Sequence, residues 1–108
     1  MFIYNASNLP AKSKKSYTDR KSRWKQNYGI TEDRFLTMLN EQQGVCAICK
    51  KPEFKRLLSV DHCHSTGQIR GLLCSKCNLG IGNLEDSTGS LESAIDYLLK
   101  AKASAKEA

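Results

Sequence analysis

Apolar residues recur with helical spacing ahead of the first cysteine pair. Thr31 has the side chain of an N-cap, and Glu32 and Asp33 follow it in the first turn, where the helix dipole favours acidic groups. Gly44 suits the left-handed conformation that ends many helices. The pattern predicts a helix between these two residues, with a buried stripe made of Phe35, Leu36, Met38 and Leu39.

Two short β-type segments flank a turn in the middle of the chain. Residues 57–60 are typical of a strand that runs into Asp61 and His62, and residues 68–73 are typical of a return strand. Residues 65–67, Ser-Thr-Gly, form a turn signal between them. This stretch therefore predicts a β-hairpin.

Two helices are predicted after the hairpin. The first opens at the second cysteine pair and extends to about Leu84, although Gly80 and Gly82 weaken it. Ser90 is predicted to cap the last helix. Its apolar positions match the i, i+3, i+4, i+7, i+8 template in full, and they are Leu91, Ala94, Ile95, Leu98 and Leu99.

The 108 residues predict one small domain of the α+β class. A hairpin followed by a helix at a cysteine pair is a ββα arrangement, and further helices flank it. The predicted organisation is a flexible N-terminal arm (1–11), a single domain (12–102) containing a basic helix (12–28), a zinc and ββα core (44–84) and a C-terminal helix (90–102), and a frayed tail (103–108).

Basic residues are concentrated near the N-terminus. Lys12 to Lys25 contains seven basic residues and one acid, within a chain of net charge +6. Tyr17, Trp24 and Tyr28 share one face of a predicted helix, which we expect to pack on the core. The positive charge favours a polyanionic partner. The side chains expected to face phosphates are Arg20, Lys21, Arg23 and Lys25.

Two C-x-x-C pairs, Cys46/Cys49 and Cys74/Cys77, have the spacing of a four-cysteine zinc site. A structural metal is a common source of stability for a domain of this size. No secretory signal and no apolar run of bilayer length is evident, so we expect no membrane partner and a cytoplasmic location in a bacterial or phage-infected host cell. In a reducing compartment, paired cysteines favour metal binding over disulfides. Cys63, the fifth cysteine, is expected to be a passive thiol.

The residues between the cysteine pairs suit phosphodiester hydrolysis. This reaction needs a base for the water and a divalent cation for the charge on the phosphate. His62 is suited to the role of base, while Asp61 and Asn78 offer the oxygen ligands that Mg²⁺ prefers. Strict strand alternation places Asp61 and His62 on opposite faces, so a shared site requires a bulge or loop at this point.

Other interpretations of these residues remain open from the sequence. His62 or His64 would replace a cysteine if the zinc site were of mixed type. Asn78 would serve only as a helix cap if no catalytic metal were bound. A redox role for the cysteine pairs is disfavoured because the βαβ context is absent.

Three strings carry a resemblance to a known family: Cys46-Ala-Ile-Cys49, Val60-Asp61-His62-Cys63-His64-Ser-Thr-Gly67, and Arg70-Gly-Leu-Leu-Cys74-Ser-Lys-Cys77-Asn78. They resemble the recombination endonuclease VII family of HNH, or His-Me finger, endonucleases. The resemblance covers roughly residues 17–100. It implies a ββα-metal fold and cleavage of DNA that leaves a 5′-phosphate and a 3′-hydroxyl.

The resemblance also implies roles for individual residues. Asp61 and Asn78 would bind the catalytic divalent cation, Mg²⁺ or another, and His62 would be the general base. His64 would support the site, and Arg70 would contact phosphate. The four paired cysteines would hold the structural zinc.

The chain departs from the junction-resolving members of this family in two respects. No acidic residue follows Asn78 on the helix, where Leu79 to Gly82 stand, and the long C-terminal helices of an intertwined dimer are not evident. The sequence therefore favours a compact nicking or general DNA endonuclease of the kind that phages and mobile elements carry, acting as a monomer or weak homodimer. The alternative is a non-catalytic zinc module that binds nucleic acid.

Overall fold

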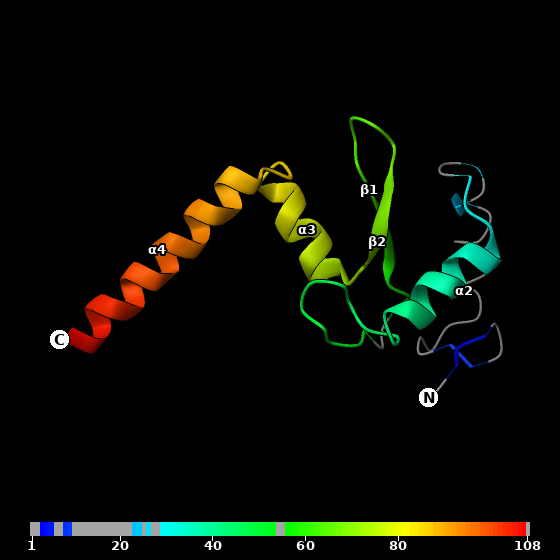
Figure 1. Cartoon of the computed structure of the whole chain (residues 1–108), viewed down its shortest axis with the longest axis horizontal. Helices are drawn as coiled ribbons and strands as arrows, with labels where there is room; N and C mark the ends of the chain where they lie inside the picture. The colour runs from blue at the N-terminus through cyan, green and yellow to red at the C-terminus, as the bar shows by residue number, and fades with distance from the viewer. Residues whose placement is uncertain are drawn as a thin grey trace. The chain divides into compact units, whose positions relative to one another are not determined.

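The structure, a computed structural model, describes residues 3–5, 8–9, 23–24, 26, 29–53 and 56–107. Its labelled elements are α2 (Glu32–Glu41), β1 (Ser59–His62), β2 (Ile69–Leu73), α3 (Ser75–Asn83) and α4 (Thr88–Glu107) (Figure 1). The predicted α+β class is confirmed. The chain divides into two compact units, Met1–Asn78 and Leu79–Ala108, which are considered separately.

Helix α2 begins as its sequence predicts. The Thr31 hydroxyl accepts a hydrogen bond from the Arg34 backbone N–H at 3.2 Å, which satisfies one of the unpaired donors of the first turn. The helix buries Phe35, Met38 and Leu39, whereas Leu36 is only half-buried. The predicted cap and most of the predicted stripe are thus confirmed.

The end of α2 is closed by two residues with positive φ, Gln43 at 58° and Gly44 at 75°. The Gly44 N–H donates to the Leu39 carbonyl at 2.9 Å, the long-range bond of a Schellman-type ending. A Cβ on Gly44 would lie 2.6 Å from Cζ of Tyr4, so a larger residue would displace the Tyr4 ring and would also be strained by the positive φ. Tyr4 itself is held by Asn40, whose side chain bonds both its N–H and its carbonyl, at 2.6 and 3.1 Å.

The hairpin is antiparallel, with Val60 opposite Leu72 and Asp61 opposite Gly71. The next pair joins His62 to Ile69, so the register shifts by one residue between Asp61 and His62. The extra residue on β2 is therefore Arg70. The irregularity expected at Asp61 and His62 is present, but the residue it adds belongs to the return strand.

Gln42 fastens the end of α2 to β2. Its side-chain amide donates to the Leu72 carbonyl and accepts from the Leu72 N–H, both at 2.9 Å. A Cβ on Gly71 would approach the Gln42 Oε1 to 3.2 Å, which explains a small residue at that position. The Gln42 side-chain amide thus pairs with the backbone of Leu72 in the way that a residue of a neighbouring strand would.

The hydrophobic core lies among α2, the hairpin and the segment leading to it. Trp24 stacks on Phe35 with ring centroids 4.1 Å apart, which confirms the predicted packing of this aromatic residue. Tyr17 and Tyr28, and most of the predicted basic helix, lie outside the described residues. The largest fully buried side chains are Phe35, Leu39, Leu57, Leu58 and Leu72.

Helix α3 follows β2 directly and continues to Asn83 despite Gly80 and Gly82, close to its predicted end. Glu53 caps its start from 22 residues away. One carboxylate oxygen accepts from the Ser75 N–H at 3.1 Å and the other from the Ser75 hydroxyl at 2.9 Å. A carboxylate at a helix N-terminus is favoured by the helix dipole.

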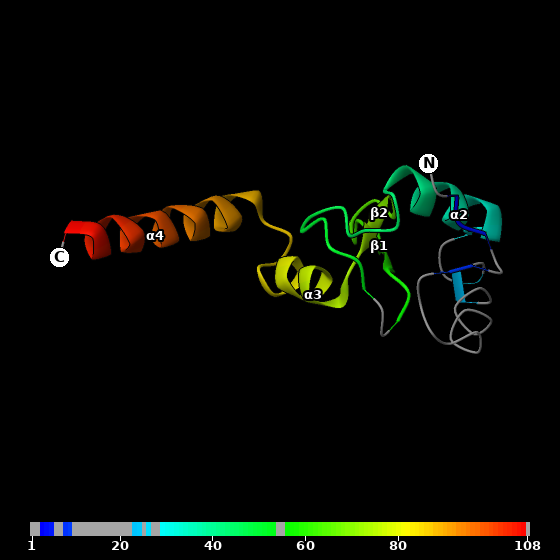
Figure 2. The same cartoon turned by 90° about the horizontal axis from the view of Figure 1, so that it is seen from below.

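Helix α4 is longer than the sequence predicts. The expected cap is Ser90, but the helix starts at Thr88, and the Ser87 hydroxyl accepts from the Ser90 N–H at 3.1 Å. It continues without a break to Glu107 (Figure 2), because the Ala- and Lys-rich segment after Lys102 has high helix propensity. Its apolar stripe is not buried, since Ile95, Leu98 and Leu99 are all more than half exposed. No described helix is both long and apolar enough to cross a membrane.

Candidate functional site

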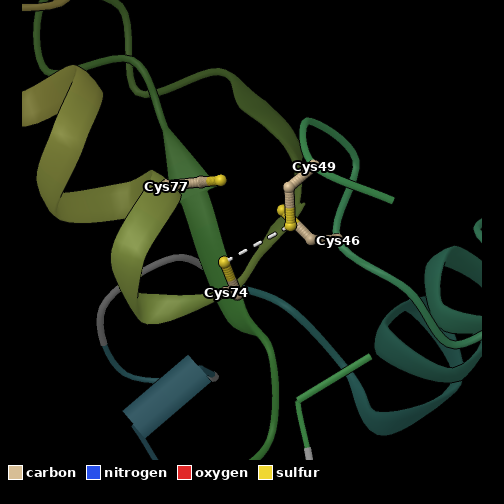
Figure 3. Close-up of side chains that lie close together, drawn as sticks. All are labelled: Cys46, Cys49, Cys74 and Cys77. Atoms are coloured by element: carbon tan, nitrogen blue, oxygen red, sulfur yellow. Dashed lines mark hydrogen bonds between the residues drawn. The ribbon is translucent and has the colours of Figure 1, made fainter. Parts of the chain in front are cut away.

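Four cysteine side chains converge on one point (Figure 3). Cys46 and Cys49 come from the turn after α2, Cys74 directly follows β2, and Cys77 lies in the first turn of α3. Their Sγ atoms all lie within 4.8 Å of one another, and the Cys49 and Cys74 sulfurs are 3.8 Å apart. None of the four is in a disulfide.

This geometry fits a zinc ion. With Zn–S bonds of about 2.3 Å, the sulfurs of a tetrahedral site lie about 3.8 Å apart. Within the described part of the chain, the cluster is the only group of three or more histidine, cysteine or acidic side chains close enough to share an ion. It includes neither histidine and not Cys63, so the structure favours a four-cysteine site over a mixed one.

Burial and hydrogen bonding inside the cluster shift the pKa values of two of its thiols in opposite directions. Burial raises the pKa of Cys46, but hydrogen bonds from the backbone of Cys74, Cys49 and Ile48 outweigh it and lower that pKa to about 6. One of them is the Ile48 N–H bond to the Cys46 sulfur at 3.4 Å. Burial and the neighbouring thiols raise the pKa of Cys77 to about 12. Four thiols this close together cannot all ionise unless a cation balances their negative charge. A bound zinc ion would supply that positive charge.

Asp61 is the only buried charged side chain among the described residues, with 8% of the residue exposed. Its carboxylate is paired with Arg70 through two hydrogen bonds, Nε to Oδ2 at 2.6 Å and Nη2 to Oδ1 at 2.9 Å. Such a two-point pair compensates for the cost of burying the charge. Asp61, the predicted metal ligand, is therefore paired with Arg70, for which the resemblance implies a phosphate contact.

His62 ends β1 half-buried, and its ring lies 4.8 Å from the exposed ring of His64, between centroids and at 55°. The tight loop after them fixes this spacing. The Cys63 N–H donates to the Gln68 carbonyl at 2.8 Å, and the Gly67 N–H donates to the Cys63 carbonyl at 2.7 Å. Both imidazoles thus lie at the turn end of the hairpin.

Cys63 lies between the two histidines and is half-exposed. Hydrogen bonds from the Thr66 side chain, and from the backbone of Thr66 and Ser65, lower the pKa of its thiol. The same turn therefore orders the histidines and favours the thiolate form of this residue.

Asn78 lies in the first turn of α3, where its N–H donates to the Cys74 carbonyl at 3.0 Å. It follows Ser75 and is not the capping residue, because Glu53 has that role. The interpretation of Asn78 as a simple helix cap is therefore wrong. Its position next to Cys77 ties it to the cysteine cluster.

Of the residues predicted to face DNA, Arg23 is helical and exposed. Arg20, Lys21 and Lys25 lie outside the described residues. A depression of about 420 Å³ beside the cluster is lined by three further basic side chains, Lys51, Arg56 and Lys76, and by Glu53, which pairs with Arg56 at 3.7 Å. The sequence pattern does not single these out, and only their convergence in space distinguishes them from other surface lysines and arginines.

Comparison with known proteins identifies relatives. The sequence model of the recombination endonuclease VII family matches residues 21–100. The Gene 59 protein of Mycobacterium phage D29 is 44% identical over 91 residues, which cover 82% of this chain and 55% of the relative. The Gene 59 protein of Mycobacterium phage L5 is 41% identical over 87 residues, covering 79% and 53%. The chain thus spans about half the length of these relatives. No solved structure matches it.

Proposed function

The chain belongs to the recombination endonuclease VII family, and we propose that it is a metal-dependent DNA endonuclease of the HNH (His-Me finger) type. The observation that carries this proposal is the family match over residues 21–100, which contains the Asp61-His62 hairpin and both cysteine pairs of the cluster. The reaction is hydrolysis of a phosphodiester bond that leaves a 5′-phosphate and a 3′-hydroxyl.

His62 acts as the general base. An imidazole titrates near neutral pH and can take a proton from the attacking water. His62 is half-buried at the turn end of the hairpin and His64 is exposed, so DNA can approach the two imidazoles from solvent. His64, whose ring centroid lies 4.8 Å from that of His62, supports the site by contact with the phosphate or the metal.

Asp61 and Asn78 hold the catalytic divalent cation through oxygen atoms, with Mg²⁺ as the first candidate. When bound, this cation supplies charge stabilisation for the phosphate and the leaving oxygen. One carboxylate and one amide leave most coordination positions to water and substrate. The two residues lie on β1 and α3, the elements that precede and follow the return strand.

The zinc cluster has a structural role in this proposal. Cys74 joins β2 to α3, and the Ala47 N–H, in the turn between Cys46 and Cys49, donates to the Leu72 carbonyl of β2 at 3.1 Å. A zinc ion bound by the four sulfurs would fix the return strand and the start of α3 together. The residues assigned to chemistry are attached to those elements.

DNA is held through positive charge. The net charge of +6 and the exposed Arg23 support this, together with the basic side chains around the depression beside the cluster. Contacts of this kind give affinity without sequence preference.

A second function is favoured by one observation. Because both oxygens of Asp61 accept hydrogen bonds from Arg70, the hairpin also suits a non-catalytic zinc module that binds nucleic acid. In that case the ion pair would be permanent, and Asp61 would never bind a metal.

Plasmid cleavage distinguishes the two functions. Zinc-loaded protein is incubated with supercoiled DNA, with Mg²⁺ and in Mg²⁺-free buffer of equal ionic strength. We expect nicked or linear product only with Mg²⁺, and nicked circles would indicate cleavage of one strand at a time. Protein that binds the plasmid but leaves it intact with both Mg²⁺ and Mn²⁺ would support the binding module instead.

A further inference from the structure

We propose that Arg70 is a positioning residue that competes with the catalytic cation for Asp61. The guanidinium holds the carboxylate in the metal-free protein and gives up at least one of its oxygens when the cation binds. This inference rests on the proposed role of Asp61 as a metal ligand. In this inference, Arg70 sets the concentration of divalent cation that is needed to occupy the site.

The hairpin irregularity is what brings Arg70 to Asp61. In a regular antiparallel ladder, Arg70 would lie opposite His62, with its side chain on the face away from Asp61. The observed pairs are instead Asp61 with Gly71 and His62 with Ile69, so Arg70 is left out of the ladder. A bulge of this type redirects the side chain of its extra residue. Here that residue reaches both oxygens of Asp61.

The carboxylate has little capacity for a second cation. Only 10% of the Asp61 side chain is exposed, and the two hydrogen bonds from Arg70 engage both of its oxygens. A divalent cation on the remaining lone pairs would lie next to the positive guanidinium, and the two charges would repel in a partly desolvated site. Metal and Arg70 therefore bind the carboxylate with negative coupling.

Arg70 has an alternative position once displaced. A third of its side chain is exposed, 34%, so the guanidinium can move into solvent or onto a DNA phosphate at the hairpin. A planar guanidinium binds a phosphate through two parallel hydrogen bonds, as it binds a carboxylate. A phosphate that draws Arg70 away from Asp61 would raise the affinity of the site for metal. Substrate and cation would then bind cooperatively.

The test measures Mn²⁺ binding to zinc-loaded protein without DNA, from the EPR signal of free Mn²⁺. Four proteins are compared: wild type, Arg70→Gln, Asp61→Asn and Arg34→Gln. The last is the control, because it removes the same charge from an exposed position on α2. Zinc content and the thermal melt establish that each variant is folded. We expect Arg70→Gln to bind Mn²⁺ about tenfold more tightly than wild type, a typical magnitude for coupled sites. Arg34→Gln should match wild type, and Asp61→Asn should lose the site.

The outcomes separate this inference from the proposed function. If Asp61→Asn loses Mn²⁺ while Arg70→Gln binds no more tightly than wild type, Asp61 is a ligand but Arg70 does not compete, and the inference fails alone. If Arg70→Gln binds more weakly, Arg70 orients Asp61 for the cation, and the competition is again refuted. If Asp61→Asn binds Mn²⁺ as wild type does, both proposals fail.

A second readout does not depend on any variant folding. The Nε–H of Arg70 is hydrogen-bonded to Asp61 Oδ2 in the metal-free protein. In wild-type protein, titration with Mg²⁺ should shift the NMR signal of this group and speed its exchange with water. A signal unchanged at saturating Mg²⁺ would contradict the competition.

Discussion

The two compact units of this chain are stabilised in different ways. Met1–Asn78 holds every buried residue among those described, together with the side-chain hydrogen bonds of Gln42 and Glu53 that join distant segments. In Leu79–Ala108, no residue with a described side chain is buried. The first unit depends on contacts between segments far apart in the chain, whereas α4 depends on the helix propensity of its own residues.

This contrast has a functional consequence. The cysteine cluster, the hairpin and Asn78 all belong to the first unit, so the proposed chemistry is concentrated where the structure is fixed by tertiary contacts. A catalytic group must be held rigidly by its surroundings to be effective. We therefore expect perturbations of the first unit to affect fold and activity together, and perturbations of the second to leave both nearly unchanged.

The largest expected effect is that of zinc removal. Structural zinc sites contribute about 10–16 kcal/mol of apparent binding free energy, more than the total stability of most small domains. Cys46→Ser, or chelation, should abolish the cooperative melt followed by Trp24 fluorescence, because Trp24 stacks in the core on Phe35. Part of the helical circular dichroism should survive as residual α4. A metal-free protein with an unchanged cooperative melt would refute the structural role of the cluster.

A pair of identical substitutions compares the two units directly. Leu72 is 0% exposed, whereas Leu98 in α4 is 61% exposed. Leu72→Ala should lower the free energy of unfolding by about 2–5 kcal/mol through the cavity it leaves. Leu98→Ala should change it by less than about 0.5 kcal/mol, as is usual for exposed positions. Denaturant titrations measure both, and equal effects would mean that α4 is buried in the native protein.

A smaller effect is expected for the polar contact that joins α2 to β2. Gln42→Ala would leave the buried N–H of Leu72 without its acceptor, at a cost of about 1–3 kcal/mol. Its neighbour Gln43 is exposed, and its side-chain amide donates to the nearby Asn40 carbonyl. Gln43→Ala is therefore the matched control, and its unfolding free energy should stay within about 0.5 kcal/mol of wild type. Similar losses in the two variants would show that Gln42 makes only a local contact.

Substitutions in the basic segment are expected to change DNA binding and to leave the stability of the fold unchanged. Replacing Arg20, Lys21, Arg23 and Lys25 by glutamine should weaken DNA binding and flatten its dependence on salt. For each phosphate that the variant no longer neutralises, the slope of log K against log salt concentration should fall by about 0.9. Fluorescence anisotropy with labelled duplex measures the slope, and the thermal melt serves as the control. An unchanged slope would show that this segment only covers the core.

Several features are predictable because they depend on residues close together in the sequence. The Thr31 cap, the hairpin turn and the spacing of each cysteine pair are local patterns, and the structure contains all three. An irregularity near Asp61 and His62 is required by the hypothesis of a shared site, but the sequence alone does not show it.

The remaining features depend on pairings between distant residues. The sequence does not reveal that the extra residue of the bulge is Arg70, because a one-residue register shift decides which side chain turns toward Asp61. The contacts of Gln42 with Leu72 and of Glu53 with Ser75 join residues 30 and 22 positions apart. Helical periodicity predicts the apolar stripe of α4, yet its residues Ile95, Leu98 and Leu99 are exposed. Periodicity predicts which residues share a face of a helix but not whether that face is buried.

The most direct test of the proposed function is the rate of plasmid cleavage by His62→Ala under single-turnover conditions with saturating Mg²⁺. Loss of a general base typically costs about 10²–10⁴-fold in rate. We predict a decrease of that order, with zinc content, thermal melt and DNA affinity close to those of wild type, because His62 lies outside the cysteine cluster. Cleavage by His62→Ala at the wild-type rate would contradict the proposal that this hairpin carries out the chemistry.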